Sequence, residues 1–220
     1  MEARLTEISQ AEALRYMGVR GEPDGQLRAE MSRCAEKLAA AAQPRAVWRL
    51  FDLKEDGTLS GTSFRPEGNA VRRLLSGGDQ AVLMAATLGT ETEILIRRAQ
   101  GENMAAAVIL DALASAAIEN VCDNLCKDLA AELAPRKLTS RFSPGYGDFP
   151  LAQQKELCSV LNVTRLLGIT LSPGGLMIPQ KSVTALMGVS DRQTVSAAGC
   201  EGCTQAVNCL YRKEGSNGGQ

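Results

Sequence analysis

The 220-residue sequence contains no histidine, and this absence excludes more classes of function than any motif that is present. Without imidazole the chain lacks the most common general base, zinc ligand and proton shuttle. Most hydrolase and zinc-hydrolase mechanisms are therefore excluded. A catalytic role has to depend on carboxylates, thiols, arginine and tyrosine, or on a bound cofactor that carries the chemistry.

The chain also lacks an excess of charge of either sign. Its 24 basic and 25 acidic residues almost cancel, so we expect neither nucleic acid nor an anionic membrane as a partner. The start has no signal-peptide pattern, and Asp111 and Glu119 interrupt the longest apolar stretches, which predicts a cytoplasmic protein without a membrane span. Seven cysteines, an odd number and unevenly placed, favour a reducing compartment over a disulfide framework.

The composition, 45% hydrophobic and 22% charged, is sufficient for one substantial core. Apolar periodicity predicts helices over residues 8–17, 24–38, 68–75, 90–99, 102–133 and 151–161. Strands are predicted over residues 46–53, 58–63, 80–88, 169–171 and 182–189, the first two as a hairpin and the last two on either side of a turn at 173–175. Because these elements follow no regular βαβα order, the sequence predicts an α+β fold with a central antiparallel sheet, a long buried helix and flanking helices.

Two local features of these elements are also expected. Thr90 and Glu93 form a capping-box pair at the start of the helix at 90–99. Cys34 lies on the apolar stripe of the helix at 24–38 and should therefore be a core residue.

The string Arg141-Phe142-Ser143-Pro144-Gly145-Tyr146 is the strongest functional signal in the sequence. Arginine binds carboxylates bidentately, glycine lets the backbone approach a ligand, and tyrosine offers a stacking face. The same residues also make an ordinary turn, because Pro-Gly before an aromatic residue is common turn chemistry. The string alone is compatible with either interpretation.

With the segments placed, the chain resembles the activation domain of vitamin B12-dependent methionine synthase, in a stand-alone form. Four strings carry the resemblance in order: Ala114-Ser-Ala-Ala-Ile-Glu119, Arg141-x-x-x-Gly145-Tyr146, the segment from Leu157 to Gly168, and Met177-x-Pro179-x-x-Ser182-Val183. The resemblance implies a site for S-adenosylmethionine. It assigns the ligand carboxylate to Arg141, the ammonium or ribose to Glu119, backbone contacts to Ser143 and Gly145, and a pocket wall to Tyr146.

Glu119 has an alternative fate as a helix carboxylate that faces solvent or pairs with Lys127. We favour the ligand role because its neighbours Ala116, Ala117 and Val121 are apolar, and a carboxylate among them needs a partner.

A cysteine-rich tail follows the resembling region. We expect one domain over residues 1–195, the tail over 196–212 and a disordered end over 213–220. Cys200, Cys203 and Cys209 are close enough to hold an iron–sulfur cluster or zinc, with a fourth ligand from Cys122, Cys126, Cys158 or another chain. A redox dithiol at Cys200 and Cys203, or thiols without a role, are the alternatives. For Cys122 and Cys126 themselves, helix packing is the favoured interpretation.

The resemblance implies a module that binds S-adenosylmethionine and supports the reductive methylation of cob(II)alamin. Cobalamin would arrive on a corrinoid-binding protein or truncated methionine synthase, and the electron on a donor such as flavodoxin or ferredoxin. Such a component needs no acid–base residue of its own, because the cofactors make and break the bonds. Two alternatives remain: a metal or iron–sulfur protein that activates another corrinoid methyltransferase, and a non-catalytic docking subunit of a split methionine synthase.

Overall fold

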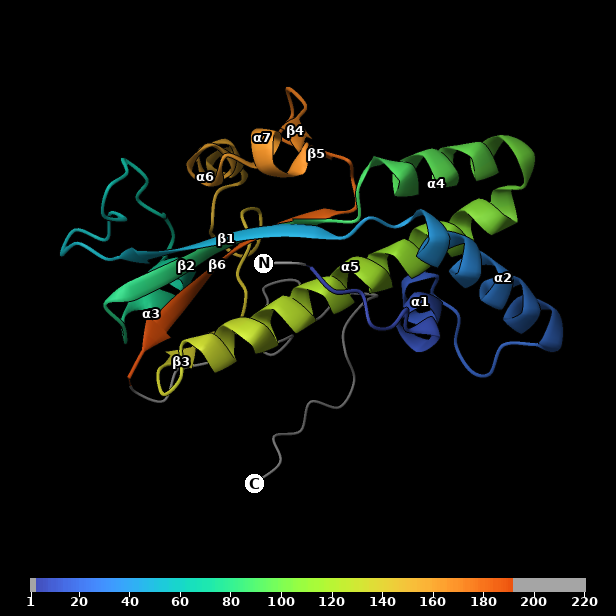
Figure 1. Cartoon of the computed structure of the whole chain (residues 1–220), viewed down its shortest axis with the longest axis horizontal. Helices are drawn as coiled ribbons and strands as arrows, with labels where there is room; N and C mark the ends of the chain where they lie inside the picture. Colours follow the sequence, from blue (N-terminus) through green and yellow to red (C-terminus); the bar gives the residue numbers. More distant parts are fainter. Residues whose placement is uncertain (1–2, 192–220) are drawn as a thin grey trace.

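The computed structural model describes residues 3–191. Its main sheet has the order β1-β2-β6-β3, with every neighbouring pair antiparallel. The strands are β1 (Arg45–Asp52), β2 (Gln80–Thr87), β6 (Ser182–Ser190) and β3 (Lys137–Leu138). Helices cover both faces, so the molecule has three layers (Figure 1). The α+β prediction with a central antiparallel sheet is confirmed.

The inner strand β2 explains the uninterrupted apolar run in the sequence. Alternate residues belong to the two cores on opposite faces: Val82 and Met84 lie in one, Leu83 and Ala85 in the other, and all four are fully buried. A strand covered on both faces has no solvent side and therefore no polar alternation.

One face of the sheet packs on four helices: α1 (Gln10–Tyr16), α2 (Gly25–Ala41), α4 (Thr90–Glu102) and α5 (Met104–Glu132). The other face carries α3 (Asn69–Leu75), the short 3₁₀ helix η1 (Leu151–Gln153), α6 (Gln154–Leu161), α7 (Val163–Leu167) and a hairpin of β4 (Thr170–Leu171) and β5 (Met177–Ile178). Figure 1 shows α5 running along the first face and α6, α7 and the hairpin on the second.

Helix α5 is the long buried helix that the sequence predicts. Asn103 caps its start, where its side chain accepts a hydrogen bond from the Ala106 amide at 3.2 Å, and Leu133 caps its end, before Pro135. Within residues 3–191, α5 is the one helix long and apolar enough to cross a membrane by length and composition alone. However, 61% of its most apolar window is buried inside the protein, against the sheet and three other helices. The core helix of a globular domain meets the same criterion.

Two local predictions are corrected here by the structure. Residues 58–63 form turns instead of a hairpin strand, with a single bridge between Leu53 and Leu59, and β1 pairs with β2 instead. The capping box at Thr90 is absent, because Gly89 takes the cap position with a φ of +83°. Glu93 instead accepts a hydrogen bond from the Gln180 amide at 3.1 Å.

The turn at residues 173–175 connects a different pair of strands from the expected pair. It joins β4 to β5, whereas the strand at 182–190 leaves the hairpin and becomes the second inner strand of the main sheet. Cys34 is 1% exposed, which confirms its place in the core. The expected domain boundaries at 195 and 212, and the disordered end, lie outside the described residues.

Candidate functional site

A polar stripe runs along α5 at a spacing of four residues: Asp111, Ser115, Glu119 and Asp123. This spacing places the four side chains on one side of the helix. Near its start, Lys181 Nζ lies 2.8 Å from Asp111 Oδ1 and donates a hydrogen bond to Ser115 Oγ at 2.9 Å. Arg141 pairs with the later carboxylates, so the stripe is held by two cations from other segments.

The segment that carries Arg141 continues from β3 along the edge of β6 and contains a β-bulge. Leu138 pairs with Val189, and Phe142 pairs with Leu186, so the segment advances by one residue more than β6 does. In a regular strand, Leu138 and Phe142 would share a face because side chains alternate. With the extra residue, Leu138 packs into the core on the α5 side and Phe142 into the core on the other side. The bulge thus sets the direction of the side chains around it.

Arg141 points to α5 and bridges two of its carboxylates. Its Nη2 lies 2.8 Å from Glu119 Oε2, and its Nη1 lies 2.8 Å from Asp123 Oδ1. The side chain of Arg141 is 20% exposed, against 47% for Glu119 and 58% for Asp123. Among the partners within residues 3–191, none accepts a hydrogen bond from Arg141 Nε.

Sulfur atoms form the inner wall next to this guanidinium. Arg141 Nη1 lies 3.6 Å from Cys126 Sγ, which in turn lies 3.7 Å from Met187 Sδ on β6. Burial raises the pKa of both Cys122 and Cys126, and the positive charge of Arg141 offsets only part of this. Both thiols are therefore protonated near neutral pH, and the wall is uncharged.

Arg141 keeps its charge despite the partial burial. Burial lowers its pKa, whereas Cys122 and Cys126, which become thiolates only at high pH, and the carboxylate of Glu119 raise it by more, so its pKa lies above its ordinary value. The guanidinium and the two carboxylates together carry a net charge of about −1 near neutral pH. The site thus contains a fixed cation that suits a carboxylate, next to anions that suit an ammonium or another cation.

Tyr16, at the end of α1, is also close to Glu119. Burial raises the pKa of its phenol, and the charge of Glu119 raises it further. Tyr16 also borders an open groove of about 240 Å³ between α1, α4 and α5. The other lining residues are Met17, Gln100, Met104, Ala107, Val108, Asp111 and Ala112. Glu119 therefore lies in an environment set by α1, α5 and the bulged segment.

The turn after Phe142 closes by its own backbone. The Gly145 amide donates to the Phe149 carbonyl at 2.8 Å, and the Tyr146 amide donates to the Ser143 carbonyl at 3.1 Å. Gly145 has a φ of +91°, a conformation that favours glycine. The rings of Phe142 and Phe149 stack with centroids 6.1 Å apart, which fixes the turn to the core.

The structure thus brings together some of the predicted site residues and separates others. Arg141 and Glu119 are in direct contact, and Ser143 and Gly145 follow in the adjoining turn. The side chain of Tyr146 is exposed: the residue keeps 65% of its surface accessible. The individual ligand roles of these five residues remain predictions.

The sequence interpretation missed Asp123 and Cys126 as neighbours of Arg141, and Tyr16 as a neighbour of Glu119. Asp123 follows Glu119 by four residues, and this spacing was a usable signal, because residues four apart on a helix are neighbours. The contact of Cys126 with Arg141 depends on the bulge, and the position of Tyr16 depends on how α1 packs on α5. Neither leaves a pattern in the local sequence.

The Met177-x-Pro179-x-x-Ser182-Val183 string has a structural explanation. The peptide bond before Pro179 is cis, and Ser182 Oγ donates to the Pro179 carbonyl at 2.8 Å. Ser182 Oγ also lies 2.9 Å from Thr87 Oγ1 on β2. The string therefore connects the β4–β5 hairpin to the start of β6 and aligns it with β2.

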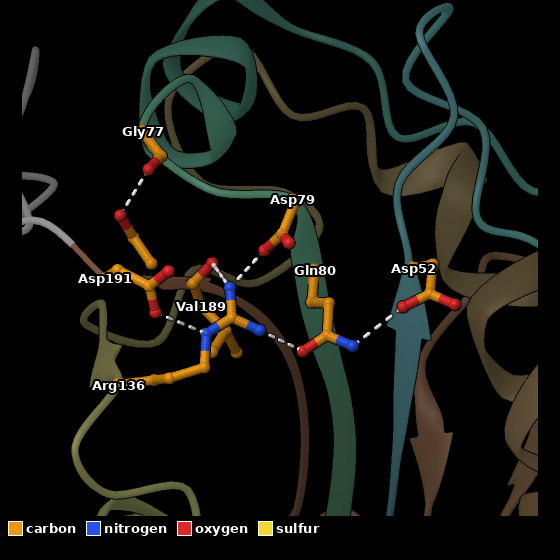
Figure 2. A network of polar contacts seen from close by, with 8 residues as sticks. Asp52, Gly77, Asp79, Gln80, Arg136, Val189 and Asp191 are labelled. Carbon is orange, nitrogen blue, oxygen red and sulfur yellow. Dashed lines mark hydrogen bonds and ion pairs between the residues drawn. The ribbon is translucent and has the colours of Figure 1, made fainter.

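A second arginine, Arg136, has a contrasting set of contacts (Figure 2). Its Nε lies 2.9 Å from Asp191 Oδ1, its Nη1 donates to Gln80 Oε1, and its Nη2 contacts Asp79 Oδ1 and the Val189 carbonyl. Gln80 extends the network to Asp52 at 2.7 Å, as Figure 2 shows. Arg136 therefore ties the segment after α5 to β2 and β6, and through Gln80 to β1.

The predicted metal ligands are not placed by the structure. Cys200, Cys203 and Cys209 lie outside the described residues. Between residues 3 and 191, no group of three or more Cys, Asp or Glu side chains has a geometry that could hold a metal ion. Three of the candidates for a fourth ligand, Cys122, Cys126 and Cys158, are free thiols, and burial raises the pKa of each.

Comparison with known proteins places the fold. No protein-family model and no curated protein matches the sequence significantly. Among solved structures, the chain is similar to the MetH reactivation domain bound to AdoHcy, with a TM-score of 0.60 and 17% sequence identity. The match covers 81% of this chain and 70% of that domain. The chain therefore has the fold of the MetH reactivation domain, the fold that its sequence motifs predict.

Proposed function

We propose that the chain binds S-adenosylmethionine beside Arg141 and supports the reductive reactivation of a corrinoid-dependent methionine synthase. The observation that carries this proposal is the contact of Arg141 with Glu119, within a fold that is similar to a reactivation domain bound to AdoHcy. S-Adenosylmethionine contains a carboxylate, an ammonium and a sulfonium, and the paired charges at this site suit such a ligand. When bound, it supplies the methyl group.

In this role the chain's own residues bind and orient the ligand. Arg141 presents an Nε–H with no acceptor inside the described part of the chain, and this group can receive one oxygen of the ligand carboxylate. Glu119 and Asp123, which contact the two terminal nitrogens of the same guanidinium, can receive the ammonium. The uncharged sulfur wall limits water on one side of the guanidinium, which strengthens charge-assisted hydrogen bonds there.

The corrinoid would be carried by a partner, a corrinoid-binding protein or a truncated methionine synthase. The chain has no histidine and therefore offers no imidazole as a cobalt ligand. Next to the Arg141 turn, three large apolar residues are exposed: Tyr146, Leu151 and Leu176, at 65%, 46% and 65%. Leu151 lies beside both Gly145 and Gly175, so these residues adjoin one another and suit a docking partner.

Calorimetric titration of the full chain with S-adenosylmethionine tests the binding step, and we expect saturable one-site binding. Reactivation is then tested by adding the chain to cob(II)alamin-bound methionine synthase that lacks its own reactivation domain. The assay also needs flavodoxin or ferredoxin as reductant and methyl-labelled S-adenosylmethionine. Label transfer to cobalt only in the presence of the chain is the expected result.

Other outcomes identify the alternatives. If the chain co-purifies with the corrinoid protein but does not bind S-adenosylmethionine, it is a docking subunit. If anaerobically purified protein contains iron or zinc that Cys203→Ser removes, it is a metal or iron–sulfur protein. Iron in a cluster could supply the electron from the chain itself, whereas zinc has no redox chemistry and would have a structural role.

A further inference from the structure

We propose that Asp123 is a specificity residue, which makes the Arg141 site prefer a sulfonium ligand over the corresponding neutral thioether. This inference rests on the proposed function, because it concerns how the same site distinguishes S-adenosylmethionine from the AdoHcy that methyl transfer leaves behind. The two molecules differ by one methyl group and one positive charge. Both carry the carboxylate that Arg141 would bind.

The argument begins with the number of charges. One cation, Arg141, faces two anions, Glu119 and Asp123, at equal distances of 2.8 Å. One anion is enough to neutralise the guanidinium, so the other gives the site its net charge of about −1. S-Adenosylmethionine has a net charge of +1 near neutral pH and AdoHcy has none. The electrostatic term therefore favours the sulfonium form.

Asp123 is the carboxylate that is not needed to neutralise Arg141. It is the more exposed of the two, at 58%, and it shares Nη1 of Arg141 with Cys126 Sγ, whereas Glu119 is the acceptor at Nη2. Because Asp123 sits on Nη1, it leaves the Nε–H free, but its negative charge repels a ligand carboxylate that binds there. Asp123 thus weakens the binding of any ligand carboxylate. Only a ligand that also carries a sulfonium regains this binding energy, because the sulfonium is attracted to the same charge.

The consequence is selective release of the thioether. AdoHcy, which has no sulfonium, meets the same repulsion from Asp123 and gains only through its ammonium, which S-adenosylmethionine also carries. The same residue that attracts S-adenosylmethionine therefore favours the departure of AdoHcy after transfer. A site with Glu119 alone would bind the two ligands with more similar affinity.

Titrations of the full chain with S-adenosylmethionine and with AdoHcy test this inference. The readout is the ratio of the two dissociation constants, because the effects of Asp123 on the carboxylate and on the ammonium are common to both ligands and cancel in the ratio. In Asp123→Asn the amide oxygen can still accept from Arg141, but the charge is lost. We expect the preference for S-adenosylmethionine to fall by about three- to ten-fold, the range for a partly exposed charge several ångströms from the sulfonium.

Two further variants control for charge and for helix structure. Asp123→Glu keeps the negative charge and should keep the preference. Asp128→Asn removes the same charge from the same helix, at a residue that pairs with Arg4 instead of Arg141, and should leave the ratio unchanged. An unchanged ratio in Asp123→Asn, or an equal fall in Asp128→Asn, would overturn the inference.

The test also separates this inference from the proposed function. If the wild-type chain binds both ligands with equal affinity, the role of Asp123 is refuted while the ligand site remains. If it binds neither, the proposed function fails and the inference fails with it.

Discussion

Arg136 and Arg141 lie five residues apart, and each contacts two carboxylates, yet their surroundings differ. The two side chains are almost equally buried, at 22% and 20% exposed. The partners of Arg136 come from separate strands and loops, as Figure 2 shows, and all three of its guanidinium nitrogens have acceptors. The carboxylate partners of Arg141 both belong to α5, and its Nε has no acceptor within residues 3–191.

This difference separates a structural arginine from a candidate binding arginine. A guanidinium whose donors all join distant segments contributes to the fold, because its loss separates those segments. A guanidinium whose partners all lie on one helix connects less of the chain. If it also has an N–H without an acceptor, and two carboxylates outweigh its single positive charge, it can still bind a ligand. The number of ion pairs alone would not distinguish the two.

The largest expected effect comes from replacing each of the two arginines by alanine and comparing ligand affinity. Arg141→Ala should weaken S-adenosylmethionine binding by about 100-fold, roughly 3 kcal/mol, through loss of charge-assisted hydrogen bonds. Arg136→Ala should leave the affinity within about two-fold. Calorimetric titration of both variants measures this, and Arg97→Ala, which removes an exposed cation of α4, is the matched control. Comparable losses in the Arg136 and Arg141 variants would eliminate the distinction.

Next in size is a backbone test beside the Arg136 network. A Cβ at Gly78 would lie 2.0 Å from the Val189 carbonyl oxygen, so the loop before β2 would have to move away from β6. Gly78→Ala should reduce the free energy of unfolding by about 2–4 kcal/mol. Urea unfolding measures the loss.

Gly101→Ala is the control for that substitution. Gly101 lies inside α4 with no atom within 4 Å of an added Cβ, so alanine should stabilise the protein by up to about 1 kcal/mol. If both glycine variants behave alike, the close approach of Gly78 to β6 does not matter for stability.

A smaller effect is expected on thermal stability when Arg136 itself is removed. Because its two carboxylate partners, Asp79 and Asp191, are mostly exposed, Arg136→Ala should lower Tm by roughly 3–6 °C at low salt. The loss should shrink in 1 M salt, which screens exposed charges. Arg141→Ala should lower Tm by less, as its partners share one helix. A reversed order in differential scanning calorimetry would contradict the structural role of Arg136.

The smallest effect concerns pH and the sulfur wall beside Arg141. Burial raises the pKa of Cys122, so the folded state holds this proton more tightly than the unfolded state does. Its contribution to stability is fully present below the ordinary thiol pKa of about 8.5 and declines as the pH rises above it. We expect the stability difference between wild type and Cys122→Ala to narrow between pH 7 and pH 9.5 in urea titrations. A widening difference would mean that a thiolate pairs with Arg141.

Much of the fold follows from local sequence patterns. The apolar run at 80–88 was predicted as a strand and the long stretch at 102–133 as a helix, and they correspond to β2 and α5. Both elements are covered on most sides, so their sequences are apolar along nearly their whole length. The hairpin expected at 58–63 was wrong because the true partner of β1 lies further along the chain, in β2. Local turn residues indicate where a chain reverses, but they do not select the strand that pairs.

The site was predictable only where its residues lie in motifs. The Arg141 string and Glu119 were identified from sequence, and the structure places the two side chains in contact. The one-residue bulge that separates Leu138 and Phe142 onto different faces cannot be read from residue types, because the extra residue shows only in the pairing with β6. The same holds for the contacts of Cys126, which depend on that pairing.

The bulge beside Arg141 also makes one edge of the main sheet unsuitable for strand addition. At that edge β3 has only two residues before the irregular segment, so another chain finds no continuous row of backbone donors and acceptors to pair with. The opposite edge, β1, is eight residues long but presents exposed Arg45 and Arg49. The irregularity that directs an arginine to α5 therefore also protects the protein against edge-to-edge aggregation.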